Sequence, residues 1–256
     1  MSHHPEHQTN NVAMTSAIGK KVLRLNSKHP LLHGWVAEGF ERVGDAFVRN
    51  FTERNELGAA CTIYHHGEPV VDVWGGYRDG STKALWEEDT CTVVFSTTKG
   101  VASMAVAHGH SRGLLDYDDR VAQYWPEFGE NGKEDVTVRQ LLSHQAGLCA
   151  IDEPLDLDAL ADPDRVANAV AKQRPAWKPG TSHGYHGITL GWYESELLRR
   201  VDPQKRTIGR YFQDEIAKPL GIEFHIGLPE DFPRHRVAVL DAWAPWQMLF
   251  HLDKMP

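Results

Sequence analysis

A serine and a lysine three residues apart form the pattern in this chain that most directly suggests catalysis. Residues 91–99 read Cys-Thr-Val-Val-Phe-Ser-Thr-Thr-Lys, so an apolar, β-branched approach ends at Ser96, and Lys99 follows at the head of an apolar helical pattern. Positions three apart on a helix share a face, so the Lys99 amine can reach the Ser96 hydroxyl. Apolar surroundings and the positive end of the helix would both favour the neutral, basic form of the lysine.

Such a pair could make Ser96 a nucleophile without a histidine, because a neutral amine can take the hydroxyl proton. The same helix end would offer the Ser96 backbone N–H to a developing oxyanion. The four-residue pattern is short, and a capping serine followed by an exposed lysine would also produce it. The apolar character of the flanking helix favours the catalytic interpretation.

A tyrosine and a histidine are further candidates. Residues 177–186 read Trp-Lys-Pro-Gly-Thr-Ser-His-Gly-Tyr-His, a rigid turn that delivers the hydroxyl of Tyr185. A tyrosine next to a lysine can be stabilised as a phenolate and serve as a proton shuttle. Taken alone, Tyr185 could also be a half-buried core residue. His144, in the segment 141–148 that turns through Gly147, could be a base, but a structural, hydrogen-bonding histidine is the favoured interpretation.

Two rival motifs indicate other classes of hydrolase. Residues 180–184 match the Gly-x-Ser-x-Gly nucleophile elbow, with Ser182 as the alternative nucleophile. The elbow needs a buried strand before it, whereas Pro175 and Pro179 precede this one and make a poor central strand. His108-Gly109-His110 is a His-x-His pair, but the residues that follow it are not the further ligands of a binuclear zinc motif.

The elements that must position these residues follow from hydrophobic periodicity. Val36, Phe40, Val43, Phe47 and Phe51 form the apolar stripe of an amphipathic helix. Two β-rich runs, 58–64 and 69–74, are separated by a plausible hairpin loop at 65–68, and the glycine pair 75–76 is expected to end the second strand.

The rest of the chain is predicted to be mostly helical. Residues 97–111 read as a helix buried on most sides and closed by Gly113. Thr137 is placed to cap a turn, and Asp162 with the proline after it opens a helix to about residue 173. Further helices are expected near 188–201 and 208–217. Strands first and helices behind indicate an α+β fold, an antiparallel sheet with a helical subdomain.

Composition narrows the function classes. The 256 residues are 41% hydrophobic and carry a formal net charge of -8, which argues against nucleic acid or an anionic membrane as the main partner. Neither a secretory signal nor a membrane span is recognised, so a cytoplasmic location is expected. Cys61, Cys91 and Cys149 are an odd, widely spaced set that indicates neither a disulfide framework nor a zinc knuckle. No metal or cofactor is expected.

Taken together, the segments around Ser96, His144 and Tyr185 resemble the superfamily of serine β-lactamases, penicillin-binding proteins and family VIII carboxylesterases. The resemblance covers about residues 34–240 and rests on Phe-Ser-Thr-Thr-Lys-Gly, Leu-Leu-Ser-His-Gln-Ala-Gly-Leu and a Trp-Lys-Pro-Gly block before a tyrosine. It implies that Ser96 is the acylated nucleophile, that Lys99 is its general base, and that Tyr185 relays the proton to the leaving group and helps to activate water.

The chain departs from this family pattern in two places. Gly187 stands where β-lactamases usually have an asparagine, which favours ester hydrolysis. The family's closing strand carries a Lys-Thr-Gly or His-x-Gly triplet. Here His225-Ile226-Gly227 lies only forty residues after Tyr185 and is interpreted as a lookalike. The closing strands are therefore expected to be absent, with a loose arm over residues 1–30 and an incomplete β-lactamase-like domain over 31–256.

These expectations define one leading function and one alternative. The leading function is a serine hydrolase that forms an acyl-enzyme on Ser96 and acts on a small-molecule ester or amide, most readily a carboxylic ester. The alternative is a catalytically impaired, lactamase-like scaffold that serves as a binding or assembly module.

Overall fold

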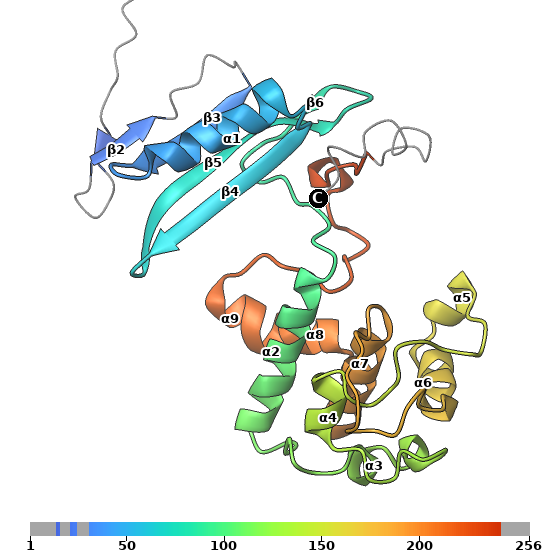
Figure 1. The fold of residues 1–256 in the computed structure, drawn as a ribbon. Coiled ribbons are helices and arrows are strands. Elements are labelled where there is room, and N and C mark those ends of the chain that lie inside the picture. Colours follow the sequence, from blue (N-terminus) through green and yellow to red (C-terminus); the bar gives the residue numbers. More distant parts are fainter. Residues whose placement is uncertain (1–13, 16–20, 25–30, 242–256) are drawn as a thin grey trace, which may run out of the picture. The chain divides into compact units, whose positions relative to one another are not determined.

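The computed structural model describes residues 14–15, 21–24 and 31–241, and the chain divides into two compact units. The sheet unit comprises residues 1–93 and 233–256, and the helical unit comprises residues 94–232. Strands dominate the first and helices the second, which confirms the predicted α+β fold (Figure 1). Among the described residues, no helix has both the length and the apolar character to cross a bilayer.

The sheet is antiparallel, with strands in the order β1-β2-β3-β5-β4 and a short β6 paired to β5. The predicted hairpin is present, and its connection tightens to two residues, His66 and Gly67, both with positive φ (52° and 79°), as two-residue hairpin turns with right-handed twist require. The strands are β1 (Met14–Thr15), β2 (Lys21–Arg24), β3 (Leu32–Ala37), β4 (Gly58–His65), β5 (Glu68–Asp79) and β6 (Ala84–Leu85).

Strand β5 continues past the glycine pair that was expected to end it. A Cβ on Gly75 would lie 2.1 Å from the Leu31 carbonyl oxygen, and one on Gly76 would lie 2.3 Å from that of Leu57. These glycines therefore permit a close approach of neighbouring backbone within the sheet, which is a second reason for glycine in a strand. The prediction of a strand end there is wrong.

Two segments of the expected N-terminal arm are also strands. β2 pairs with β3, with Val22 opposite Ala37, and β1 pairs with β2. The prediction of a loose arm is therefore wrong for residues 14–15 and 21–24, whose backbone extends the antiparallel sheet beyond β3. The other residues of that arm lie outside the described part of the chain.

Helix α1 (Glu41–Glu53) packs against this sheet and buries Phe47 among strand residues. The apolar stripe predicted a start at Val36, but Val36 lies in β3 opposite Val71. Gly39, with φ of 92°, turns the chain between strand and helix, and the Glu41 carboxylate accepts its N–H at 3.0 Å. The remaining buried residues of this core are Leu32, Val36, Ala37, Val70, Val71 and Val73.

The helical unit is built around α2 and α7, which pack on each other and share a core with the shorter helices. The helices are α2 (Thr97–Ser111), α3 (Val121–Tyr124), α4 (Val138–Leu142), α5 (Leu157–Leu160), α6 (Pro163–Lys172), α7 (Thr189–Val201), α8 (Ile208–Phe212) and α9 (Lys218–Leu220), with a 3-10 turn at Pro126–Gly129 and a π-helical turn at Gln213–Ala217. A further 3-10 turn, Arg234–Arg236, belongs to the sheet unit.

Several predicted helix ends are confirmed. Thr137 accepts the Gln140 N–H at 3.2 Å, and Asp162 accepts two first-turn N–H groups ahead of Pro163. Gly113, with φ of 72°, follows α2 in the left-handed conformation. Helix α2 is buried on one stripe only, through Ala102, Ala105, Val106 and Gly109, and not on most sides as expected.

A buried lysine joins the end of α6 to the loop before α4. Lys133 is inaccessible to solvent, and its amine donates to the carbonyl oxygens of Glu130, Ala171 and Gln173 at 2.8, 2.9 and 2.7 Å. These bonds satisfy carbonyls that a helix C-terminus leaves without partners. Burial lowers the pKa of Lys133 to about 8.

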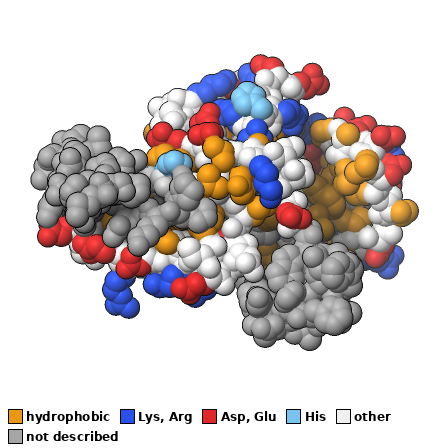
Figure 2. All heavy atoms as spheres, turned by 90° about the horizontal axis from the view of Figure 1, so that it is seen from above, with side chains coloured by type: hydrophobic (Ala, Val, Ile, Leu, Met, Phe, Trp, Pro, Cys, Tyr) orange, Lys and Arg blue, Asp and Glu red, His pale blue; other side chains and the backbone are white. Residues whose placement is uncertain are grey.

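The surface in the view of Figure 2 mixes hydrophobic side chains with charged groups of both signs. Two of the most exposed large apolar residues, Phe95 (70%) and Ile188 (73%), are close in sequence to Ser96 and Tyr185. Apolar surface near catalytic candidates is typical of a binding surface, whereas scattered apolar residues elsewhere need no explanation.

Candidate active site

The backbone just before α2 is in an unusual conformation. Phe95 has φ of 44°, in the left-handed region that a bulky residue adopts only at a conformational cost. A turn follows, in which Thr98 donates to the Phe95 carbonyl at 3.0 Å and Lys99 donates to that of Ser96 at 3.1 Å. Ser96 occupies the N-cap position and is exposed, so this strained turn presents its hydroxyl at the positive end of α2.

The structure brings Lys99 to Ser96. The Lys99 amine donates to the Ser96 hydroxyl oxygen at 3.1 Å and to the Gly187 carbonyl oxygen at 2.5 Å. The Gly187 carbonyl therefore contacts the candidate site directly. Sequence reasoning missed this contact, because it considered Gly187 only as the place of a missing asparagine. The carbonyl holds the end of this flexible side chain beside the serine, because it accepts one of the N–H groups of the Lys99 amine.

Tyr185 completes a three-residue cluster. Its hydroxyl lies 2.8 Å from the Ser96 oxygen, and the Lys99 amine stands 5.1 Å from the centre of its ring. The hydrogen bond with Ser96 lowers the pKa of Tyr185, and the hydrogen bond and charge of Lys99 lower it further. Tyr185 is 56% exposed, and Ser96 is exposed as well. Among the described residues, the cluster is therefore less enclosed than the apolar surroundings predicted from the sequence.

His144 lies behind Tyr185 and does not reach the serine through any hydrogen bond seen in the described part of the chain. Its Nδ1 accepts the backbone N–H of His186 at 3.1 Å, and its ring meets that of Tyr185 edge-on at 5.1 Å. Burial, His183 and Lys99 lower the pKa of His144, in that order of importance. These contacts agree with the structural, hydrogen-bonding role that the sequence favoured over a base.

The rival motifs lack the surroundings they need. The segment before Ser182 contains no strand, and Ser182 is an exposed loop residue whose carbonyl accepts the Trp177 indole N–H at 3.1 Å. His108 contacts the Tyr211 hydroxyl at 3.0 Å, whereas His110 contacts the Leu115 carbonyl at 2.9 Å. Across the described ranges, no group of three or more His, Cys, Asp or Glu side chains is arranged to hold a metal ion.

The triplet at 225–227 is not part of a strand in the structure. Its backbone packs against α8 so closely that a Cβ on Gly209 would lie 2.0 Å from the Ile226 carbonyl oxygen. This packing supports the interpretation of the triplet as a structural lookalike.

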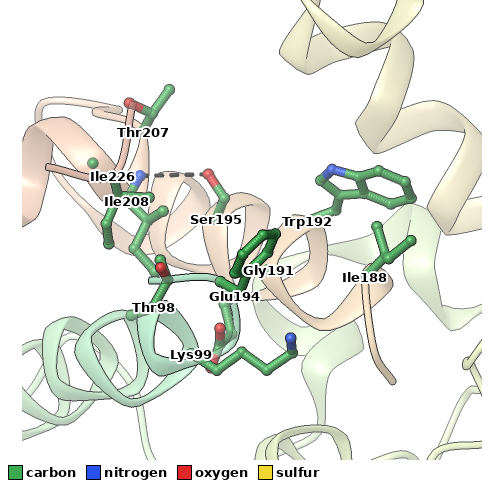
Figure 3. A pocket seen from close by; sticks show the side chains of 13 residues that line it. Thr98, Lys99, Ile188, Gly191, Trp192, Glu194, Ser195, Thr207, Ile208 and Ile226 are labelled. Atoms are coloured by element: carbon green, nitrogen blue, oxygen red, sulfur yellow. Dashed lines mark hydrogen bonds between the residues drawn. The ribbon is translucent and has the colours of Figure 1, made fainter. Parts of the chain in front are cut away.

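Two cavities adjoin the three-residue cluster within the helical unit. One, of about 380 Å³, is bordered by Lys99 and is largely apolar (Figure 3). The other, of about 560 Å³, is bordered by Tyr185, Gly187 and Cys149. Ile188 and Trp192 line both cavities and separate them. The other main lining residues of the first cavity are Phe95, Thr98, Ala102, Glu194, Ile208 and Ile226.

Glu194 is a buried acid at the first cavity that sequence reasoning also missed. One of its carboxylate oxygens accepts the Ser103 hydroxyl at 2.7 Å, and the other has no partner among the described residues. Figure 3 shows it reaching from α7 towards α2, on the side where Lys99 lies. Burial raises the pKa of Glu194 to about 7, against smaller opposite effects of Ser103 and Lys99. A charged residue among the apolar positions Leu190, Tyr193 and Leu197 of α7 is the signal that could have found it.

Comparison with known proteins places this chain in one family. The family model described as Beta-lactamase matches residues 45–254, and the chain belongs to that family. It is 38% identical over 203 residues to "Esterase/beta-lactamase LipL" of Mycobacterium tuberculosis, covering 78% of this chain and 46% of that protein.

Two solved structures are similar in fold as well as sequence. A family VIII carboxylesterase matches with a TM-score of 0.76 and 42% identity, over 81% of this chain and 56% of that one. A penicillin-binding protein homologue from Caulobacter crescentus matches with a TM-score of 0.77 and 39% identity, over 82% and 56% of the two chains. The chain therefore spans about half the length of these relatives.

Proposed function

We propose that this chain carries the nucleophile and proton-transfer groups of a serine hydrolase that acts on small carboxylic esters through an acyl-enzyme on Ser96. The observation that carries the proposal is the position of the Ser96 oxygen, 3.1 Å from the Lys99 amine and 2.8 Å from the Tyr185 hydroxyl. A nucleophile within hydrogen-bond reach of two proton-transfer groups is the arrangement that covalent catalysis needs.

Acylation would begin with transfer of the Ser96 proton to neutral Lys99 while the serine oxygen attacks the ester carbonyl carbon. The carbonyl oxygen becomes an oxyanion, which the Ser96 backbone N–H at the positive end of α2 can stabilise. The carbon–oxygen bond to the alcohol then breaks, and the Tyr185 hydroxyl gives its proton to the leaving oxygen. The proton on Lys99 restores the tyrosine.

Deacylation would reverse these roles with water as the nucleophile. Lys99 as the amine takes a proton as the water oxygen attacks the acyl carbon. It takes this proton either directly from water or through Tyr185, which passes its own proton to Lys99 and then takes one from water. The Ser96 oxygen leaves and regains a proton from Lys99, and the carboxylic acid departs. The lowered pKa of Tyr185 supports this part of the proposal, because it reduces the free energy needed to form the phenolate.

Two observations favour esters over β-lactams. Gly187 cannot offer the side-chain amide that the resembling β-lactamases carry at this position. One similar structure is a family VIII carboxylesterase, and the Mycobacterium tuberculosis relative is described as both an esterase and a β-lactamase. The two apolar cavities on either side of Ile188 and Trp192 would receive the acyl and alcohol groups of such an ester.

The test is covalent labelling combined with turnover. A short-chain nitrophenyl ester should be hydrolysed, and a fluorophosphonate should label Ser96, as located by peptide mass spectrometry. Ser96→Ala should lose both signals, and Ser182→Ala, which changes another exposed serine, should keep both. A label on Ser182 would favour the nucleophile-elbow alternative, and the absence of both labelling and turnover would favour the non-enzymatic scaffold.

A further inference from the structure

A fully buried histidine lies directly after the proposed catalytic tyrosine. His186 has no solvent exposure, and its Nε2 lies 2.8 Å from the backbone nitrogen of Leu148, which must be the donor. Only an unprotonated ring nitrogen can accept this hydrogen bond. The single ring proton of neutral His186 therefore belongs on Nδ1, and a backbone amide determines the tautomer.

The Nδ1 of His186 in turn faces the ring of His144. The two Nδ1 atoms are 3.1 Å apart, and the backbone N–H of His186 also points to the His144 Nδ1 at 3.1 Å. The His144 Nδ1 is thus an acceptor shared by two donors, and the proton of His144 belongs on Nε2. One amide of the segment 144–148 consequently fixes the protonation of both rings.

These bonds are part of a clamp between two segments distant in the sequence. Gly184 donates its N–H to the His144 carbonyl at 3.1 Å, and the Thr189 hydroxyl donates to the Leu148 carbonyl at 2.6 Å. His144 itself has φ of 62°, a left-handed conformation that persists only where the surroundings impose it. The clamp encloses Tyr185 and Gly187, the two residues of this segment that contact Ser96 and Lys99.

We propose that His186 and His144 form a neutral imidazole pair that positions the Tyr185 hydroxyl and the Gly187 carbonyl at the Ser96–Lys99 pair. The inference rests on the proposed function, because it assigns positioning residues to that site. Neither histidine transfers a proton to substrate. Their role is to hold two reacting or orienting groups at distances where a displacement of about 1 Å can cost roughly 100-fold in rate.

The electrostatic surroundings agree with a pair that stays neutral. The titratable side chains that act on it are His183 and Tyr185 from the same segment and Lys99 from α2. Burial, with His144 and His183, lowers the pKa of His186 to about 4. A second proton on His186 would also place an N–H against the Leu148 N–H. Both the geometry and the charges therefore disfavour the protonated form of His186.

Nitrogen NMR of the full chain tests the tautomers directly. His186, assigned by its loss in His186→Gln, should carry its proton on Nδ1 and show no change from pH 7 down to about pH 5. The proposal is overturned if the proton is on Nε2, or if His186 titrates near pH 6.5 as an ordinary histidine does. This readout does not depend on enzymatic activity.

Two substitutions at His144 test the positioning role. Asparagine can place an oxygen where Nδ1 lies and tolerates positive φ, so His144→Asn should keep kcat/KM within about 3-fold of wild type. His144→Leu removes the acceptor and should lower kcat about 10- to 100-fold with a smaller change in KM. Equal activity of both variants and wild type would refute positioning. Equal loss in both would show that the imidazole ring itself is required and not its acceptor atom, which would also overturn the proposal.

Matched controls separate these effects from folding and from the proposed function. His66 is an exposed histidine with φ of 52° in the sheet unit, so His66→Asn and His66→Leu report the backbone cost together with the loss of one ring contact to His65 at 4.1 Å. If His144→Leu does not fold, His186→Gln keeps an acceptor for Leu148 and the backbone donor to His144 while it removes the ring donor, and it should also lower kcat. If wild-type Ser96 is not labelled by fluorophosphonate, the proposed function fails, and the tautomer result still decides the pair.

Discussion

The two units of this chain organise their residues in different ways. In the sheet unit, the hairpin of β4 and β5 joins residues that are neighbours in sequence, and close backbone contacts at Gly75 and Gly76 allow the strands to pack. In the helical unit, the contacts that matter for chemistry span long stretches, and Tyr185 meets Ser96 across 89 positions. All three catalytic candidates belong to the helical unit. The β4–β5 hairpin thus depends on pairing between close neighbours, whereas the proposed chemistry depends on long-range contacts within the helical unit.

The largest expected loss of activity follows substitution of Ser96 or Lys99, in contrast to other residues of the helical unit. Lys99→Ala should lower kcat/KM for a nitrophenyl ester by about 10⁴-fold, nearly as much as Ser96→Ala, because groups that act as one unit lose activity together. Lys172→Ala, which changes an exposed lysine of the same unit, should leave the rate unchanged. Near-normal activity of Lys99→Ala would contradict the proposed mechanism.

The next largest effect concerns the Tyr185 hydroxyl, which contacts Ser96 although the two residues are far apart in the sequence. Tyr185→Phe should lower kcat about 10²- to 10⁴-fold, the range expected for loss of a general acid–base group. Because Ser96 and Lys99 lower the pKa of Tyr185, the wild-type rate should rise with pH below the range of an ordinary tyrosine, and the variant should lack that rise. Rates measured from pH 6 to 10, together with melting temperatures, check both statements. An identical pH profile in the two proteins would remove Tyr185 from the proton path.

A truncation in the core tests whether long-range order supports the site. Leu141 is fully buried in the core of the helical unit, so Leu141→Ala should cost about 2–5 kcal/mol of unfolding free energy in urea. It should also reduce fluorophosphonate labelling of Ser96 at temperatures where the wild type is fully labelled. Leu157 is 84% exposed, and Leu157→Ala should change stability by less than about 0.5 kcal/mol. Equal stability of the two variants would refute the importance assigned to this core.

The smallest effect concerns a buried carboxyl group and depends on pH. Glu194 has a pKa raised from 4.5 to about 7, so the unfolded chain releases its proton at lower pH than the folded chain does. The stability contributed by the protonated group is complete below pH 4.5 and is lost as the pH rises through 7. Glu194→Gln should therefore match wild type at pH 4.5 and exceed it by about 2–3 kcal/mol at pH 8. Urea unfolding at both pH values checks this, with the exposed Glu230→Gln of the same unit as control. A wild type that gains stability above pH 7 relative to the Glu194→Gln variant would reverse the assignment.

The parts of the fold that could be predicted are those fixed by adjacent residues. Thr137 and Asp162 cap helices within three positions of themselves, and the residues of the β4–β5 hairpin pair with close neighbours. Val36 could not be assigned in this way, because its pairing with Val71 overrides the helical spacing that it shares with Phe40 and Val43.

The residues of the candidate site show the same difference between what nearby sequence predicts and what only tertiary contacts reveal. Ser96, Lys99 and Tyr185 were identified from short motifs and from their resemblance to a known family. The Gly187 carbonyl and the buried Glu194 were missed, because a backbone oxygen has no sequence signature and a glutamate shows its burial only when α7 packs on α2. Residue type predicted the proposed reacting groups, whereas tertiary contact revealed the Gly187 carbonyl beside Lys99 and the buried Glu194 beside Ser103.

The conformation of Phe95 links the nucleophile to the surface that would receive its substrate. Glycine or asparagine would adopt φ of 44° with less strain, so an aromatic residue there has a use for its ring, which borders the cavity beside Lys99. The same residue thus sets the backbone turn before Ser96 and lines a cavity that, under the proposed function, would receive part of the ester. Substitutions that reshape this cavity would also shift the attacking oxygen, so reactivity and chain-length preference should change together when position 95 is varied.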